Sequence, residues 1–167
     1  KIITSFLKDS KGHLWIGSFT GLYRYDGTHF IGFKKSRDSN SISSNNVLSL
    51  CEDRKGNIWG ATPIGIFCYN PARNQFKNYS TINIGIGPGV ENVVCDSSGN
   101  IWAGGIPGLL KYNAKGDSLE QVKANAADKN ALTVDRIRQN CLMTDFSGNG
   151  LWIATREGLN YFDTRTG

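Results

Sequence analysis

One motif occurs four times in this chain of 167 residues. It starts at Asp9 as DSKGHLWIGSFTGLYRYD, at Asp53 as DRKGNIWGATPIGIFCYN, at Asp96 as DSSGNIWAGGIPGLLKYN and at Asp145 as DFSGNGLWIATREGLNYFD. The four aspartates are 44, 43 and 49 residues apart, and in every copy a glycine follows the tryptophan by 6 residues. A period in the forties with several short strands per unit is typical of β-propeller blades.

Each copy carries the turn residues of a β-hairpin. In D-x-x-G the aspartate takes the first turn position and the glycine the fourth, which suits a type I turn closed by a residue at positive φ. A strand such as IWGAT follows, and a two-residue tip with a second glycine then leads into the next strand. The residues that we expect to build this structural motif are Asp9, Gly12, Trp15, Gly21, Asp53, Gly56, Trp59, Gly65, Asp96, Gly99, Trp102, Gly108, Asp145, Gly148, Trp152 and Gly158.

The strand after the second glycine is apolar on both faces. In the second copy, Ile66 lies on one face and Tyr69 on the other. A half-exposed sheet would alternate between apolar and polar residues, so these strands indicate small sheets stacked face to face. We therefore expect the four tryptophans to be buried as wedges between blades, each covering on the order of 150–250 Å².

The sequence predicts an all-β fold: a single partial β-propeller, residues 1–167, in the form of an open arc of about four blades of four antiparallel strands each. The expected blades are approximately 1–38, 39–80, 81–124 and 125–167, and the last lacks its outer strand. No spare segment could close the ring, so we expect a fragment of a larger propeller. Its open blade edges are predicted to self-associate.

Charge and residue usage argue against several function classes. The net charge is +5, but the 19 Lys and Arg are scattered, whereas a nucleic-acid site concentrates them on one face. Cys51, Cys68, Cys95 and Cys141 have no metal-ligand spacing, so we expect no metal or cofactor. They are predicted to be core residues, although a Cys51–Cys95 or Cys51–Cys141 bridge is an alternative in an oxidising compartment.

No catalytic group stands out. His13 and His29 have neither metal-ligand spacing nor a nucleophile near them in the sequence. The repeated aspartates are best explained as turn caps, because DSSGN supplies too few oxygen ligands for calcium. We therefore expect that this chain is not an enzyme. No apolar run reaches the ~18 residues of a membrane-spanning helix.

The pattern D-x-x-G-x-[LI]-W-[IGA]-[GA], then G-[LI], then an aromatic residue and Asp or Asn, resembles the two-component regulator propeller repeat. The lead-in ISSNNVLSLCEDRKGNIWGAT, residues 42–62, also resembles that repeat. The resemblance covers essentially the whole chain. The fourth copy is looser, with one extra residue before its tryptophan and a longer lead-in from Leu132 to Asp145.

This resemblance implies a sensor. Proteins of the family are typically hybrid two-component receptors whose periplasmic propellers help to recognise an oligosaccharide and signal across the inner membrane to a histidine kinase. It implies a periplasmic location, an oligosaccharide partner, and membrane attachment only through the parent chain. Two alternatives remain from the residues: a protein-interaction scaffold without a small ligand, and a non-catalytic part of a propeller polysaccharide lyase or hydrolase.

The tips between second and third strands are our candidate ligand-binding residues. In a propeller these tips and the links between blades emerge on one face. The candidates are Phe19, Thr20, Pro63, Ile64, Ile106, Pro107, Arg156 and Glu157. An exposed patch of Phe, Ile and Pro side chains is a contact surface. The alternative is that the tips pack on neighbouring links of the same propeller.

Overall fold

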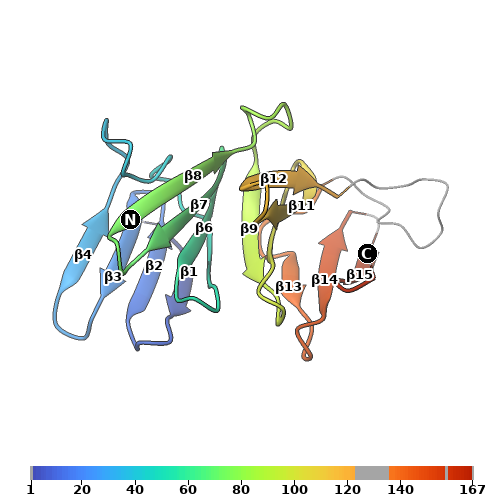
Figure 1. The fold of residues 1–167 in the computed structure, drawn as a ribbon, viewed down its shortest axis with the longest axis horizontal. Coiled ribbons are helices and arrows are strands. Elements are labelled where there is room, and N and C mark those ends of the chain that lie inside the picture. Colours follow the sequence, from blue (N-terminus) through green and yellow to red (C-terminus); the bar gives the residue numbers. More distant parts are fainter. Residues whose placement is uncertain (1, 123–135, 157, 167) are drawn as a thin grey trace.

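Fifteen strands form four antiparallel sheets in the computed structural model, which describes residues 2–122, 136–156 and 158–166 (Figure 1). The first blade contains β1 (Ile3–Lys8), β2 (Leu14–Ser18), β3 (Gly21–Tyr25) and β4 (Phe30–Phe33). The second contains β5 (Ser49–Glu52), β6 (Ile58–Thr62), β7 (Gly65–Asn70) and β8 (Gln75–Ser80). The third contains β9 (Val90–Cys95), β10 (Ile101–Gly105), β11 (Gly108–Asn113) and β12 (Ser118–Gln121). The fourth contains β13 (Leu142–Thr144), β14 (Gly150–Thr155) and β15 (Gly158–Asp163).

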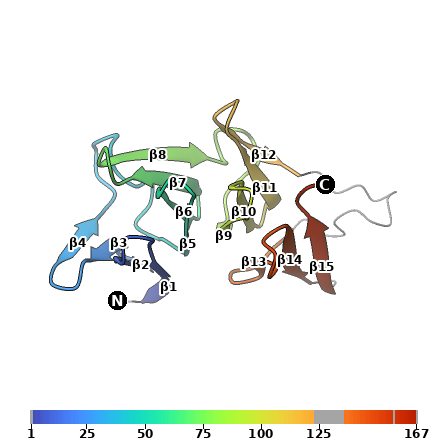
Figure 2. The same cartoon turned by 60° about the horizontal axis from the view of Figure 1, so that its bottom comes forward.

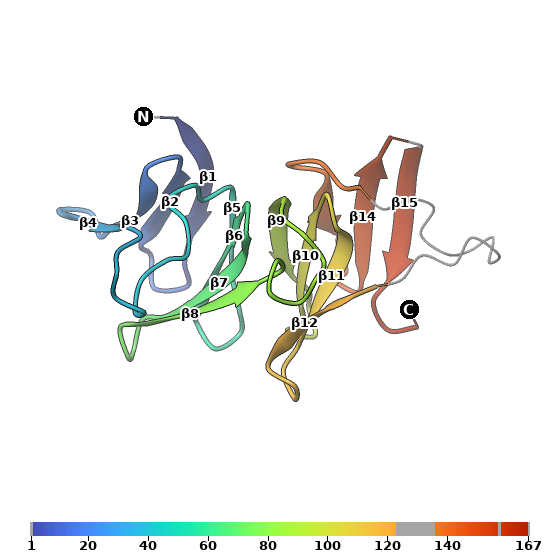
Figure 3. The same cartoon turned by 90° about the horizontal axis from the view of Figure 1, so that it is seen from above.

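The four sheets follow one another around an open arc (Figure 2). The strands of each sheet pair in sequence order, and the first strands of neighbouring sheets contact one another, β1 with β5, β5 with β9 and β9 with β13. The first strands therefore line the inside of the arc. Viewed from above, the second and third blades lie side by side in the middle of the chain (Figure 3). The predicted all-β open arc of four blades, with three strands in the last, is confirmed.

The D-x-x-G turn holds a carboxylate that binds the tryptophan of its own blade. Asp96 Oδ1 accepts the backbone N–H groups of Ser98 at 2.9 Å and Asn100 at 2.8 Å. Its Oδ2 accepts the Asn100 side-chain amide at 2.7 Å and the Trp102 indole N–H at 2.9 Å. Gly99 closes the turn at φ 86°, a conformation that favours glycine. The turn is thus joined directly to the core.

Three separate hydrophobic clusters fill the three junctions between blades. The first contains Trp15, the second Trp59 and the third Trp102, each of them 4% exposed or less. Each tryptophan packs against residues of the following blade: Trp15, for example, stacks edge-on against Tyr69 with ring centres 5.5 Å apart. The cores of this chain are therefore the spaces between sheets, as stacked two-sided sheets require.

The fourth tryptophan differs from the other three. Trp152 is 38% exposed, so the expectation that it is buried was wrong. The extra residue in this copy puts Trp152 seven positions after Asp145, and the aspartate instead accepts the Tyr161 hydroxyl at 2.9 Å. Trp152 also lies on the face of the last sheet that no other described sheet covers. Register places Met143 and Tyr161 on that same face.

The predicted blade boundaries remain a prediction. The boundary between residues 124 and 125 lies outside the described residues, as does the start of the lead-in at Leu132. The first two boundaries fall in the segments that connect β4 to β5 and β8 to β9.

We predict that Asp96→Ala lowers the free energy of unfolding by about 3 kcal/mol, because four N–H donors at a buried site lose their charged acceptor. Urea unfolding followed by tryptophan fluorescence measures this loss. Asp145→Ala is the matched control, because its carboxylate binds no indole and its side-chain partners Ser147 and Tyr161 are exposed. Asp145→Ala should lower the free energy of unfolding by clearly less than Asp96→Ala does. Equal losses would contradict the stabilising role of the hydrogen bond between Asp96 and the Trp102 indole.

Self-association through the open faces is also a prediction. Leu159, 67% exposed, lies on the same face as Trp152, so Leu159→Lys should shift the chain toward the monomer in analytical ultracentrifugation. Ile82→Lys, at a 51% exposed position in the link between the second and third blades, should leave association unchanged. A wild-type chain that stays monomeric at high concentration would refute the prediction.

Candidate functional site

The described tip residues lie at the end of the blades where the links run. The Gly89 N–H donates to the Pro63 carbonyl at 2.5 Å, and the Gly89 carbonyl accepts the Ile106 N–H at 2.9 Å. The link between the second and third blades thus brings these two tips together. The Phe19 N–H bonds instead to the Ile2 carbonyl at 3.1 Å.

The remaining tip residues differ in exposure. Phe19 and Ile106 are each 46% exposed, Arg156 is exposed, Thr20 and Ile64 are half-buried, and Pro107 is buried. Glu157 lies outside the described residues. The tips therefore remain candidate binding residues, and several of them pack on neighbouring links.

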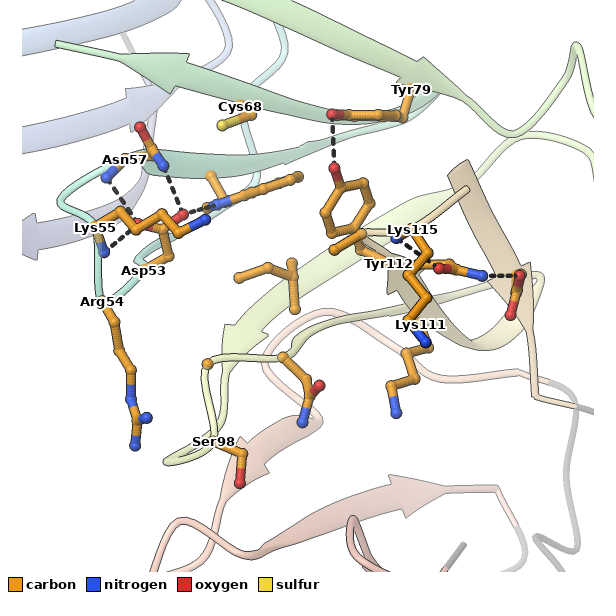
Figure 4. Close-up of a pocket in the computed structure, with 17 residues that line it drawn as sticks. Asp53, Arg54, Lys55, Asn57, Cys68, Tyr79, Ser98, Lys111, Tyr112 and Lys115 are labelled. Atoms are coloured by element: carbon orange, nitrogen blue, oxygen red, sulfur yellow. Dashed lines mark hydrogen bonds between the residues drawn. The ribbon is translucent and has the colours of Figure 1, made fainter. Parts of the chain in front are cut away.

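A cleft opens at the opposite end of the blades, between the second and third sheets (Figure 4). Its volume is about 700 Å³, within the range of small-molecule sites. The second blade contributes the D-x-x-G turn, Trp59, Cys68 and Tyr79. The third blade contributes its own D-x-x-G turn, the end of β11 and the turn after it. The cleft thus exists because two blades pack side by side.

Aromatic rings form one wall of the cleft. Trp59 lies 5.7 Å from Tyr79 and 4.8 Å from Tyr112, measured between ring centres. Both tyrosine hydroxyls bind Asp117 Oδ1, at 2.8 and 2.9 Å, and this carboxylate also pairs with Lys77. Burial, followed by the hydrogen bond with Tyr112, raises the pKa of Tyr79, so its hydroxyl stays protonated. The hydrogen bonds to Asp117 therefore hold both tyrosine rings in place.

The acidic groups of the cleft are already engaged. Asp53 accepts four hydrogen bonds, from the Lys55 and Asn57 backbone, the Asn57 amide and the Trp59 indole, at 2.8–2.9 Å. Burial works to raise the pKa of Asp53, but the bonds from Trp59 and Asn57 outweigh it and hold this pKa below its ordinary value. Glu120 accepts the Asn113 amide at 2.6 Å.

Three cationic side chains surround these groups: Arg54, Lys55 and Lys115. A Cβ added to Gly99 would lie 3.3 Å from Arg54 Cδ, so the arginine crosses from its own blade to the turn of the next. Lys111 also borders the cleft, but its Nζ lies 4.9 Å from the centre of the Trp102 ring, on the face of the third blade that packs against the fourth. Within the described ranges, none of these four side chains forms an ion pair with a carboxylate.

The cleft holds no obvious reactive group. Burial raises the pKa of Cys68 to about 12, so its sulfur is a thiol and not a thiolate near neutral pH. The described part of the chain brings together no group of three or more His, Cys, Asp or Glu side chains able to hold a metal ion. All four cysteines are unpaired in the structure. What the arrangement offers is recognition by charge, amide groups and aromatic rings.

Sequence reasoning missed this cleft, because it treated the lysines and arginines as scattered. The signal was present in the repeat: Arg54 and Lys55 occupy the two positions after the motif aspartate, and Lys115 follows Trp102 by 13 residues. These positions meet only once the blades are packed, across the junction of the second and third sheets. To predict the cleft from the sequence, one would have to know both the position of each cation within its repeat and which blades are neighbours.

Comparisons with known proteins agree with the fold and the motif. The family model described as a two component regulator propeller matches residues 1–20 and 41–63, which confirms the resemblance seen in the sequence. No curated protein matches the chain significantly. Among the described residues no helix has the length and apolar character needed to cross a membrane.

Solved structures match over nearly the whole chain. One is the extracellular domain of BT3049 from B. thetaiotaomicron, assigned to the hybrid two component systems, with 22% identity, a TM-score of 0.78 and coverage of 99% of this chain and 24% of that chain. Another is the extracellular domain of BT4673 from B. thetaiotaomicron, assigned to the one component systems, with 23% identity, a TM-score of 0.76 and coverage of 96% and 21%. This chain thus spans about a fifth to a quarter of their lengths.

An enzyme also shares the fold. Virginiamycin B lyase from Staphylococcus aureus matches with 11% identity and a TM-score of 0.62, covering 96% of this chain and 55% of that chain. At these identities the likeness to all three structures shows the propeller fold and leaves activity to be argued from the site.

We predict that the stability of the chain falls as the pH is lowered from 7 to about 3, and that Asp53→Asn reduces this pH dependence. The carboxylate has a folded pKa below its unfolded value, so its contribution is present above the unfolded pKa of about 3.9 and is lost as the pH falls through the folded one. Urea midpoints at several pH values measure the effect. The exposed Asp38, changed to Asn, is the control, and the same slope in both variants would contradict the prediction.

Proposed function

We propose that this chain is part of the periplasmic sensor propeller of a hybrid two-component receptor and that it helps to recognise an oligosaccharide. The observation that carries the proposal is the match of the two component regulator propeller model to the first two repeats, in a chain whose four blades repeat the same motif. The likeness to two extracellular domains of bacterial signalling proteins is consistent with it. Attachment to the inner membrane and a histidine kinase would belong to the parent protein.

The interblade cleft supports a binding role. It combines two fixed tyrosine rings, amide side chains and cations in a volume of about 700 Å³. Ligand sites commonly pair an apolar or aromatic wall with a small number of placed polar groups. A scaffold that docks only proteins would not need such a hollow.

A catalytic role is less well supported by the same residues. Acid–base cleavage of a glycan needs a carboxylate pair or a histidine free to exchange protons. In the cleft, the Asp53 carboxylate accepts hydrogen bonds within its own turn and from Trp59, and the Glu120 carboxylate accepts one from Asn113. We therefore propose that this chain is not itself catalytic.

The test uses the parent protein in its own cells. An antibody raised against this chain is expected to detect, in the inner-membrane fraction, a band far larger than the 18.3 kDa of the chain. Thermal shift of the purified extracytoplasmic region with a panel of oligosaccharides should then reveal a stabilising ligand, because a ligand that binds the folded state raises the melting temperature. A small soluble or secreted protein would refute the receptor proposal.

A further inference from the structure

We propose that the cleft between the second and third blades binds an acidic saccharide, with carboxylate or sulfate groups held by Arg54, Lys55 and Lys115. The inference rests on the proposed function and names the class of ligand for it. It starts from a local charge imbalance. The cleft gathers these three cations and two acids, and both acids are engaged within the protein.

The other junctions show that the repeat itself does not require these cations. At the first position after the motif aspartate, where the second blade has Arg54, the first blade has Ser10 and the third has Ser97. At the next position Lys55 has a counterpart in Lys11 of the first blade, whereas the third blade has Ser98. Where the third blade has Lys115, the second has Ala72. The combination of Arg54, Lys55 and Lys115 is therefore a property of this junction and not of propeller packing.

An acid is also missing from this junction. Between the first and second blades, Glu52 accepts the Ser10 backbone N–H at 2.7 Å and the Ser10 hydroxyl at 2.6 Å. The corresponding residue of the third blade, directly before the motif aspartate, is Cys95, which lies close to Arg54. Replacing an acid by a neutral thiol beside an arginine leaves positive charge uncompensated. A bound anion would supply the missing charge.

The uncharged part of the lining fits a saccharide. The Asn57 and Asn100 amide nitrogens donate to Asp53 and Asp96, at 2.8 and 2.7 Å, and within the described residues the carbonyl oxygens of these two amides accept no hydrogen bond. Such oxygens are acceptors for sugar hydroxyls. The half-buried rings of Tyr79 and Tyr112 add an aromatic wall for the apolar faces of sugar rings.

A nucleic acid fits the cleft less well. Duplex or single-strand sites present a basic surface or groove that follows the phosphate backbone. Here the cations surround a single hollow of about 700 Å³, bounded by the turns of two blades. A short charged oligosaccharide matches that size and shape.

The test is calorimetric titration of the 167-residue chain with three probes: trigalacturonate, a chondroitin sulfate disaccharide and neutral maltotriose. An acidic probe should bind and maltotriose should not. Raising NaCl from about 20 to about 300 mM should weaken the binding, since salt screens exposed charges. The double variant R54Q/K115Q should weaken it by on the order of tenfold or more.

Two further variants separate charge from folding. K34Q/K35Q removes the same charge from the first blade and its link and should bind like wild type. R54K/K115R keeps the charge and should retain binding. Unchanged tryptophan fluorescence and far-ultraviolet circular dichroism establish that each variant is folded.

The outcomes distinguish this inference from the function on which it rests. If maltotriose binds and the acidic probes do not, the acidic class is wrong while recognition of a saccharide survives. Binding of an acidic probe that R54Q/K115Q leaves unchanged would place the site elsewhere and overturn the assignment of the cleft. If no probe binds, the inference fails, and the receptor proposal is judged by the size and location of the parent protein.

Discussion

A carboxylate that holds an indole is the interaction on which the arc depends; it is buried in Asp9 and Asp96 and half-buried in Asp53. In each of the first three blades an aspartate closes a tight turn with its backbone bonds and positions a tryptophan with its second oxygen, as Asp9 does with Trp15 at 2.8 Å. The tryptophan in turn fills the space against the next blade. One side chain thus links the local turn to the packing of two sheets. The desolvation of the aspartate is offset by charge-assisted hydrogen bonds, which are about twice as strong as neutral ones.

The fold was predictable because its signals lie within one repeat. The interval between aspartate and tryptophan decides whether the indole reaches the carboxylate, and the glycines mark turns at positive φ such as Gly12 at 90°. The exposure of Trp152 was not predictable from its position in the motif. It depends on the extra residue in the fourth copy and on the absence of a described sheet beyond it.

The candidate site was less accessible to sequence reasoning, because it belongs to two repeats at once. Arg54 and Lys115 are far apart in the sequence, and each alone resembles an ordinary surface charge. The contact of Arg54 with Gly99 and the sharing of Asp117 by Tyr79 and Tyr112 require the register between sheets. The tips, chosen because propeller geometry places them on one face, pack in part against the links instead, as Ile106 does on Gly89.

The three hydrophobic clusters do not merge. The stability of the chain is therefore a sum of contributions from each blade and from each junction between neighbouring blades, and not the stability of a single core. In such an array each unit is held by its own stability and by its contacts with adjacent units. Within the described residues, the second and third blades each contact two neighbouring sheets. The junction between them is therefore supported on both sides, by the first blade and by the fourth. The cleft at that junction lies between two supported sheets even though it is open to solvent.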